Sequence, residues 1–325
     1  MAFPITIAAP RPVAEHTAWK PATRAELAVL GIYFLAVMIL VDVVNVRPGI
    51  EVMTAVVALA AVAISRLGTA FIRDWWYFIA GLLMWNLSGP IARLSPFPWH
   101  LDFMLNLDRI IGLGRQPVAV VQHALYNPAH LSLIDVFTVV VYNMHLPEPF
   151  IAGYFLWRLN RLAYLRFAAS VLILLVVGGI TFVLFPAVPP WMAAKHLIYS
   201  GSQYVTSPQG HVYLPNIKNL FGPIASQHPL PFHGTPIFYL FQLQGDPVAA
   251  FPSEHMAFPM LEMITFTALL GKRGLILILW IAAVFFSVLY LGEHWVTDVI
   301  FGWLYAIVIF YFVRYATRSL DSQQN

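Results

Sequence analysis

Two short motifs near the C-terminal end of the chain hold the residues best suited to chemistry. His255 lies in F-P-S-E-H, and His294 and Asp298 follow thirty-nine residues later in Y-L-G-E-H-W-V-T-D. Residues four apart on a helix share a face, so the Asp298 carboxylate can hold one imidazole nitrogen of His294 and leave the other free to react. It would also stabilise the imidazolium or phospho-histidine that forms after attack. We therefore expect His294 to be an oriented nucleophile or base.

The residues that precede His255 have the pattern of a helix start. Pro252 suits a first turn and Ser253 suits a cap, which leaves backbone N–H groups pointing outward. A helix N-terminus of this kind attracts phosphate. His255, one turn in, could protonate the departing oxygen of a phosphoester. The two motifs together predict a nucleophile, an orienting acid, a proton donor and an anion cradle.

Composition indicates where this site lies. Of the 325 residues, 60% are hydrophobic and 10% are charged, and the mean hydropathy is +0.74. A soluble domain of this length would have too little polar surface to cover its core, so the sequence predicts an integral membrane protein. The absence of cysteine excludes disulfides, iron–sulfur clusters and thiolate zinc sites. A net charge of +3, spread over short loops, does not suggest a nucleic-acid partner.

The apolar segments predict an all-α transmembrane bundle of eight helices, with six to eight as the defensible range, because crossing the bilayer takes about twenty apolar residues. The second segment contains Glu51 and Arg66 and is expected to be short or re-entrant. Residues 1–24 are expected to form a cytoplasmic tail instead of a cleavable signal, and residues 25–320 a single catalytic domain. The predicted spans are 27–46, 50–68, 72–92, 132–157, 165–185, 252–270, 274–292 and 295–315.

The distribution of basic residues predicts the orientation. With a cytoplasmic N-terminus, the inner segments carry twelve of the eighteen Lys and Arg residues, as the positive-inside rule requires. His255 and His294 then face the extracytoplasmic side; a seven-helix count would reverse part of this scheme. Residues 93–131 and 186–251 are expected to lie outside, and the second stretch, which opens with P-A-V-P-P-W, to form an ordered cap over the substrate.

The two motifs and the interval between them resemble the type 2 phosphatidic acid phosphatase superfamily, and within it the inositol phosphorylceramide synthase-like branch. The resemblance covers about residues 72–315, with support from L-D-R-I-I-G-L-G at 107–114 and from P-P-W in the long outer segment. It implies that His294 forms a phospho-histidine, that Asp298 is its partner and that His255 is the acid for the leaving group. It also implies a six-helix core, here with about two extra N-terminal helices, and a reaction without metal or other cofactor.

The sequence departs from the superfamily at the residues that hold phosphate. The first-motif lysine and Arg-Pro have no clear counterpart, and the expected Ser-Arg appears as Ser287 and Val288. The phosphate would then need other cations. Our candidates are Arg93, Arg109 and Lys195, although each could equally be an interfacial anchor.

Three further polar residues are assigned to the substrate. Glu254 replaces the usual glycine or leucine, and it could hold a polyol acceptor, pair with one of the cations or face away. Tyr142 and His145 lie three apart on one helix face and are candidates to line the cavity, with hydrogen bonding between helices as the alternative.

These patterns predict an enzyme that transfers a phosphoryl group or phospho-headgroup from a lipid phosphate or phospholipid donor. Water as acceptor would make it a lipid phosphatase, and an alcohol or polyol a phosphotransferase. The prediction favours the transferase because the outer cap could exclude water and because the resemblance is to a synthase branch.

Other interpretations stay open. The two histidines with Glu254, Glu293 and Asp298 could bind zinc, although no HExxH-type spacing occurs. A transporter or flippase could use the His–Asp pair as a proton relay, but no symmetry between two halves of the chain is visible. In a non-catalytic scaffold, the same polar residues would only hold helices together.

Overall fold

The computed structural model describes residues 74–79, 81, 88–130, 132–144, 147–218, 220 and 248–320. The expected tail at 1–24 and the expected spans at 27–46 and 50–68 lie outside these residues. Within the expected span at 72–92, residues 74–79 are helical and a short helix, α4 (Ser88–Arg93), closes the segment.

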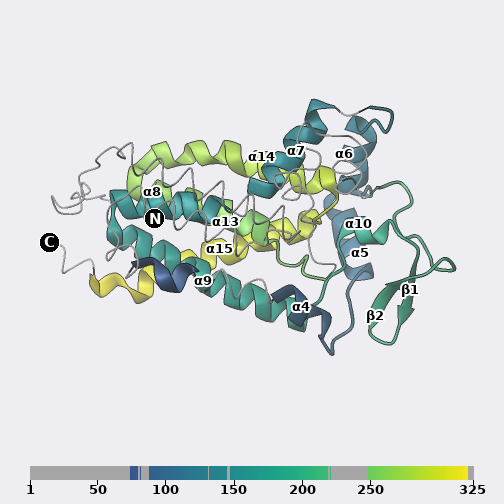
Figure 1. Cartoon of the computed structure of the whole chain (residues 1–325), viewed down its shortest axis with the longest axis horizontal. Helices are drawn as coiled ribbons and strands as arrows, with labels where there is room; N and C mark the ends of the chain where they lie inside the picture. The colour runs from purple at the N-terminus through teal and green to yellow at the C-terminus, as the bar shows by residue number, and fades with distance from the viewer. Residues whose placement is uncertain are drawn as a thin grey trace, which may run out of the picture.

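Four long helices form the bundle that carries the two motifs. Helix α13 packs against both α9 and α15, and α9 also packs against α15. All four lie along the long axis of the molecule in Figure 1. They are α9 (Arg161–Leu184), α13 (Glu254–Leu270), α14 (Ile278–Leu291) and α15 (Val296–Ala316), with 3₁₀ turns η2 (Gly271–Leu277) and η3 (Arg318–Leu320).

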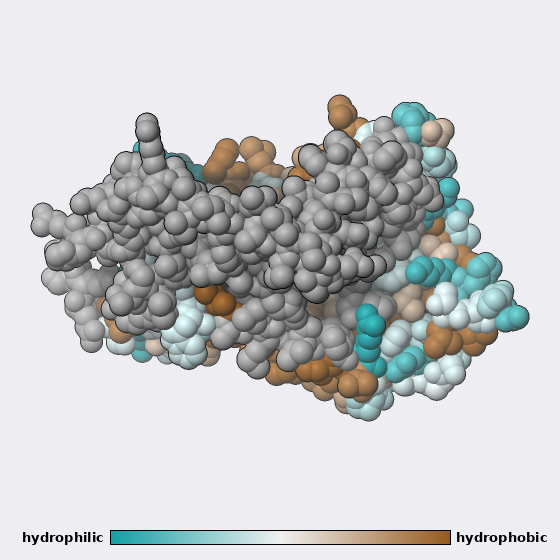
Figure 2. Space-filling view, in the orientation of Figure 1, coloured by the Kyte–Doolittle hydropathy of each residue, from teal (hydrophilic) through white to brown (hydrophobic). Residues whose placement is uncertain are grey.

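Three helical runs in the described part of the chain are long and apolar enough to cross a membrane: Arg161–Leu184, Glu254–Leu291 and Val296–Ala316. The second run contains α13, η2 and α14, and the chain turns back on itself at Gly271, whose φ is 63°. Large apolar side chains are exposed along the helices, such as Val176, Leu279 and Val308. Figure 2 shows hydrophobic surface at the edges of this face that are not grey. Such a surface suits lipid, and the predicted fold class, a helical membrane protein, is confirmed.

The expected span at 132–157 is wrong as one continuous helix. The structure has two helices instead, α7 (Leu133–Met144) and α8 (Glu148–Leu159). Pro147 and Pro149 lack the N–H that a continuous helix needs, so a new helix begins here. Helix α7 packs against α14, whereas α8 packs against α9 and α13.

Shorter elements gather at one end of the molecule (Figure 1). They come from the two stretches that were expected to lie between spans, and β1 pairs with β2 as an antiparallel hairpin in which Leu197 lies opposite Thr206. These elements are α5 (Asp102–Ile111), α6 (Pro117–Leu125), α10 (Pro190–Ala193), β1 (Leu197–Ser200) and β2 (Gln203–Thr206).

Backbone hydrogen bonds join three distant segments beside the start of α13. Ala187 forms parallel bridges with His100 on one side and Ala249 on the other. The N–H of His100 donates to Pro186 O (2.8 Å), and the N–H of Ala187 donates to Val248 O (3.2 Å). The segment that leads into α13 is therefore held by both outer stretches of the chain.

Gly302 allows α15 to approach the start of α13 closely. A Cβ at this position would collide with the carbonyl oxygen of Ser253. We expect Gly302→Ala to lower stability by about 1–3 kcal/mol, because the two packed helices must move apart. Thermal unfolding in detergent measures this effect. Ile300→Ala, on the same helix at a largely exposed side chain, is the control, and an equal loss in both variants would contradict the close-packing argument.

Candidate functional site

His294 lies in the turn between α14 and α15, and two oxygen atoms lie within hydrogen-bond distance of its Nδ1. Its Nδ1 is 3.0 Å from the carbonyl oxygen of Ala250 and 3.3 Å from Asp298 Oδ2. A carbonyl oxygen can only accept a hydrogen bond, so Nδ1 carries a proton. In the neutral ring Nε2 therefore holds the lone pair, as a nucleophile requires.

His255, in the first turn of α13, faces that lone pair. Its Nδ1 is 3.0 Å from His294 Nε2, and it must be the donor if Nε2 is the acceptor. The Tyr142 ring from α7 stacks on the His255 ring, with centroids 4.6 Å apart and planes 24° apart. The structure thus brings together three of the predicted site residues from α7, α13 and the α14–α15 turn.

Asp298 lies in the first turn of α15 and is fully buried. Its Oδ2 accepts a hydrogen bond from the N–H of Trp295 (2.9 Å) as well as facing His294. Its Oδ1 has no hydrogen-bond partner among the described residues. The predicted i, i+4 pairing is present, and Asp298 shares the His294 proton with Ala250 O.

Ser253 occupies the N-cap position of α13, as predicted, but its hydroxyl makes no capping bond. Its backbone N–H donates to Asp298 O (3.0 Å), which ties the start of α13 to α15. The hydroxyl oxygen is buried and has no hydrogen-bond partner in the described part of the chain. Ser253 Oγ is thus a buried polar atom, two residues before His255, that has no protein partner among the described residues.

The Glu254 side chain lies against α9. It is buried, and its carboxyl lies so close to Gly178 of α9 that a Cβ there would collide with it. Of the three roles left open by the sequence, this placement favours facing away from the histidine pair.

The three candidate cations are all exposed. Arg93 ends α4 and its carbonyl accepts from Gln203 Nε2 (3.2 Å), while Arg109 Nε donates to Gly114 O (3.3 Å). Lys195 has its Nζ 4.5 Å above the ring of Trp191. His145, the remaining candidate, lies outside the described residues.

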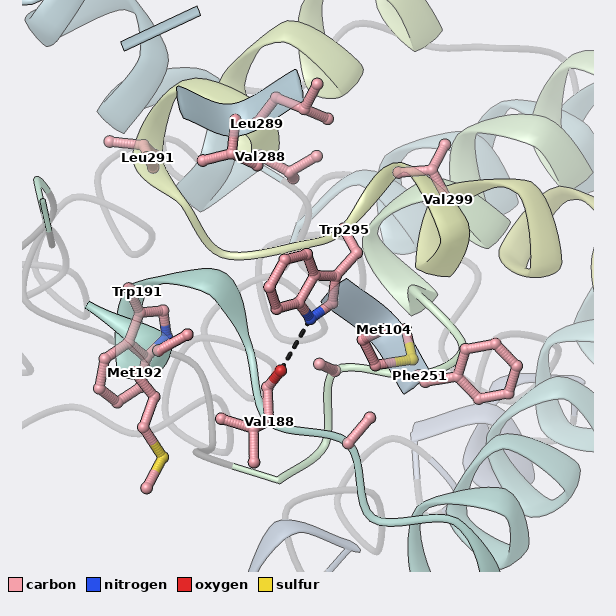
Figure 3. Packing of buried hydrophobic residues seen from close by; sticks show 14 of the residues in the cluster. Met104, Val188, Trp191, Met192, Phe251, Val288, Leu289, Leu291, Trp295 and Val299 are labelled. Carbon is pink, nitrogen blue, oxygen red and sulfur yellow. Dashed lines mark hydrogen bonds between the residues drawn. The ribbon is translucent and has the colours of Figure 1, made fainter. Parts of the chain in front are cut away.

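The P-P-W segment contacts the α14–α15 turn directly. The indole N–H of Trp295 donates to Val188 O (2.7 Å), as Figure 3 shows. The backbone N–H of Trp191 donates to Gly292 O (2.8 Å). The turn that carries His294 is therefore held by the long outer segment.

The PAP2 superfamily model matches residues 103–312, which is more than half of the chain and includes both histidine motifs. The chain belongs to the PAP2 superfamily. It is 24% identical over 248 residues to the phosphoinositol dihydroceramide synthase of Bacteroides thetaiotaomicron, a match that covers 74% of this chain and 75% of that protein. No solved structure matches significantly.

These findings confirm the family and branch that the motifs resemble. This PAP2 protein is an integral membrane enzyme of the lipid phosphatase and phosphotransferase class. No group of three or more His, Asp or Glu side chains within the described ranges is arranged to hold a metal ion.

Sequence reasoning missed two buried polar residues of this PAP2 site. Asp108 Oδ1 accepts from the N–H (2.8 Å) and the hydroxyl (2.7 Å) of Thr297, and Asp108 Oδ2 accepts from the N–H of Val296 (3.0 Å). Gln122 Nε2 donates to Tyr290 O (2.8 Å). The available signal for Asp108 was the L-D-R motif, but nothing in the sequence indicated its partner 189 residues away.

The buried carboxyl of Glu293, the residue before His294, is expected to make the stability of the protein depend on pH. Burial raises the pKa of its carboxyl to about 8, against the opposing effects of the nearby Trp191 indole and Lys195 ammonium. The folded protein therefore favours the protonated form. This contribution is fully present below the unfolded pKa, about 4.5, and is lost as pH rises through about 8.

We expect the unfolding temperature of the wild type to fall by on the order of 5 °C between pH 6 and pH 9. Glu293→Gln, which mimics the protonated carboxyl, should flatten this dependence. Thermal unfolding in detergent across the pH range provides the measurement, with Asp102→Asn as a control at an exposed acid. An unchanged slope in Glu293→Gln would show that another group is responsible.

Proposed function

We propose that this protein transfers a phosphoryl group or phospho-headgroup from a lipid donor to an acceptor alcohol through a phospho-histidine at His294. The observation that carries the proposal is the arrangement of the two imidazoles. Ala250 O and Asp298 hold Nδ1 of His294, and its Nε2 faces His255 Nδ1 at 3.0 Å. A nucleophile with an oriented lone pair and an adjacent proton donor is what the first half of such a reaction needs.

In the first step, Nε2 of His294 attacks phosphorus and the bond from phosphorus to the leaving lipid oxygen breaks. His255, which acts as the imidazolium, gives its Nδ1 proton to that oxygen, so the lipid alcohol leaves neutral and His255 becomes a neutral imidazole. The His294 ring, now bonded to phosphorus, is stabilised through its Nδ1–H by Ala250 O and Asp298.

In the second step, His255 acts as a base instead of an acid. His255 takes the proton from the acceptor hydroxyl, the hydroxyl oxygen attacks phosphorus, and the phosphorus–nitrogen bond breaks. Nε2 of His294 recovers its lone pair, and both histidines return to their starting protonation states.

The two rings must separate when the donor binds. Attack needs Nε2 about 3 Å from phosphorus, and the leaving oxygen on the far side must lie within hydrogen-bond reach of His255. An in-line arrangement therefore places the two nitrogens roughly 6–7 Å apart, compared with 3.0 Å in the structure.

As the helix N-terminus that binds phosphate, the start of α13 is favoured over the start of α15. In α15 the N–H groups of Trp295, Val296 and Thr297 already donate to the carboxylates of Asp298 and Asp108. Two carboxylates at that helix end repel phosphate, whereas the Ser253 hydroxyl beside α13 can donate to it.

Transfer to an alcohol is favoured over hydrolysis because the site is enclosed. His294 is 4% exposed and Tyr142 is 2% exposed, so water has little access to the phospho-histidine. The relative named as a synthase supports the same choice. Hydrolysis by the same site, which would make the protein a lipid phosphate phosphatase, is the alternative.

Extracytoplasmic placement of the site is supported by the charges at the two ends of the bundle. The end of the bundle opposite the histidines carries seven basic residues, and positive residues favour the cytoplasmic side. They are Arg158, Arg161, Arg166, Lys272, Arg273, Arg314 and Arg318.

The proposal is tested by following both possible products with purified protein and chelator present. The name of the relative makes a phosphoinositol lipid and a dihydroceramide the first donor and acceptor to test, with phosphatidic acid as a simpler donor. A new product in which the donor headgroup is joined to the acceptor supports transfer. Release of the headgroup phosphate with no such joined product supports hydrolysis. Neither product from any donor in the panel would contradict the proposal.

A further inference from the structure

We propose that Asp108 and Gln122, from the outer helices α5 and α6, are positioning residues that hold the catalytic turn in its reactive geometry. The turn runs from the end of α14 through His294 to the first turn of α15. The inference rests on the proposed function in taking His294 as the nucleophile. It adds two residues that act on His294 through the backbone of this turn.

Helix α15 lacks an N-cap acceptor of its own. Ser, Thr, Asp or Asn usually occupies this position and accepts from the first free N–H groups of the helix. Here the N-cap residue is Trp295, whose indole can only donate, and it does so to Val188 O. Asp298 of the same turn accepts from the N–H of Trp295, so the N–H groups of Val296 and Thr297 need an acceptor from elsewhere in the chain.

Asp108 supplies that acceptor from α5. Its two oxygens accept from the N–H groups of Val296 and Thr297 and from the Thr297 hydroxyl, at 2.7–3.0 Å. The side chain is completely buried, where hydrogen bonds to a charged acceptor are strong and water cannot replace them. Asp108 thus caps the helix that begins directly after the nucleophile.

The cap determines where Asp298 and His294 lie. Asp298 belongs to the same first turn, and its Oδ2 both accepts from Trp295 N–H and faces His294 Nδ1. If the first turn frays, Asp298 and the Ala250 carbonyl can no longer hold the ring from two sides. A displacement of about 1 Å at a reacting group can lower a rate by about 100-fold.

Gln122 holds the other end of the turn. Its Nε2 donates to Tyr290 O (2.8 Å) and to Lys218 O (3.0 Å), and its Oε1 accepts from the N–H of Lys218 (2.8 Å). A Cβ on Gly292, whose φ is 76°, would lie 3.4 Å from Gln122 Nε2. The end of α14 is thereby tied to α6 and to the outer segment, two residues before Gly292.

The test compares Asp108→Asn and Gln122→Leu with Asp102→Asn, a matched control on the exposed side of α5. In Asp108→Asn, an amide N–H group replaces one acceptor and the charge is lost. We expect kcat to fall at least about 10-fold in both variants with KM changed less than about threefold, while Asp102→Asn stays unchanged. The amplitude of a phospho-enzyme burst gives the active fraction, so kcat is expressed per folded site.

Thr297 provides variants that keep the inference testable if Asp108→Asn does not fold. Thr297→Val removes one of the three hydrogen bonds to Asp108, and Thr297→Ser retains it. We expect a smaller loss of kcat in the valine variant and recovery in the serine variant. A lower unfolding temperature with unchanged kcat per site in all these variants would reduce both residues to a structural role and overturn the inference.

The same assay separates failure of this inference from failure of the proposed function. If His294→Ala retains full activity, the proposed function fails whatever the Asp108 variants do. If His294→Ala is inactive while Asp108→Asn and Gln122→Leu retain kcat, only the positioning role fails.

Discussion

Replacement of His294 by alanine is expected to lower kcat on a lipid donor by about 1000-fold or more, because the variant lacks the atom that attacks phosphorus. Donor binding should change little, since Ser253 and the start of α13 are left intact. Turnover is measured with a lipid donor labelled in the headgroup phosphate. Rapid acid-free quenching of the wild type should capture the label on protein, and the label should be missing in the variant.

His123→Ala serves as the matched control for this experiment. His123 is an exposed histidine of α6. Its replacement should leave both turnover and labelling unchanged. Label that persists on the His294→Ala protein would assign the covalent intermediate to another residue. Full turnover without labelling of the wild type would indicate direct transfer.

Replacement of His255 by alanine is expected to slow transfer from a lipid donor by about 100- to 10,000-fold, the range typical of a lost general acid. His255 Nδ1 is placed 3.0 Å from the nucleophilic nitrogen, on the side from which the leaving oxygen must be protonated. A lipid alkoxide is a poor leaving group without that proton. The loss should therefore depend strongly on the leaving group.

An activated aryl phosphate separates proton donation from other roles of His255. Its leaving group departs without protonation, so formation of the phospho-enzyme from this substrate should be nearly normal in His255→Ala. His294→Ala should be inactive with both substrates. An equal loss on lipid and aryl substrates in His255→Ala would assign His255 to binding or to positioning of His294.

The fold class and the pairing of His294 with Asp298 could be predicted because they follow from local patterns. Hydropathy along the chain reveals apolar helices directly. The four-residue spacing of His294 and Asp298 predicts that they pair, and the structure has this pairing at 3.3 Å, although His294 lies in the turn before α15 and the two residues do not share a helix face. The P-S-E-H segment likewise marked a helix start, which the structure places at Glu254.

Predictions failed or stayed open where the outcome depends on contacts between helices. The 132–157 segment is apolar throughout, but the prolines at 147 and 149 divide it into α7 and α8, which pack against different helices. For Glu254, sequence could not choose between holding a polyol acceptor, pairing with a cation and facing away, whereas the structure places its carboxyl against Gly178 of α9.

The sequence by itself determined that this is a helical membrane protein with a His–Asp pair and a second histidine, because composition and helical periodicity act over a few neighbouring residues. Only the tertiary structure decided that the two imidazoles meet at 3.0 Å, that Tyr142 stacks on His255, and that Asp108 caps α15. These contacts join residues far apart in the chain. They form only when α5, α7, α13 and α15 pack together, and no local spacing records which side chains that packing brings into contact.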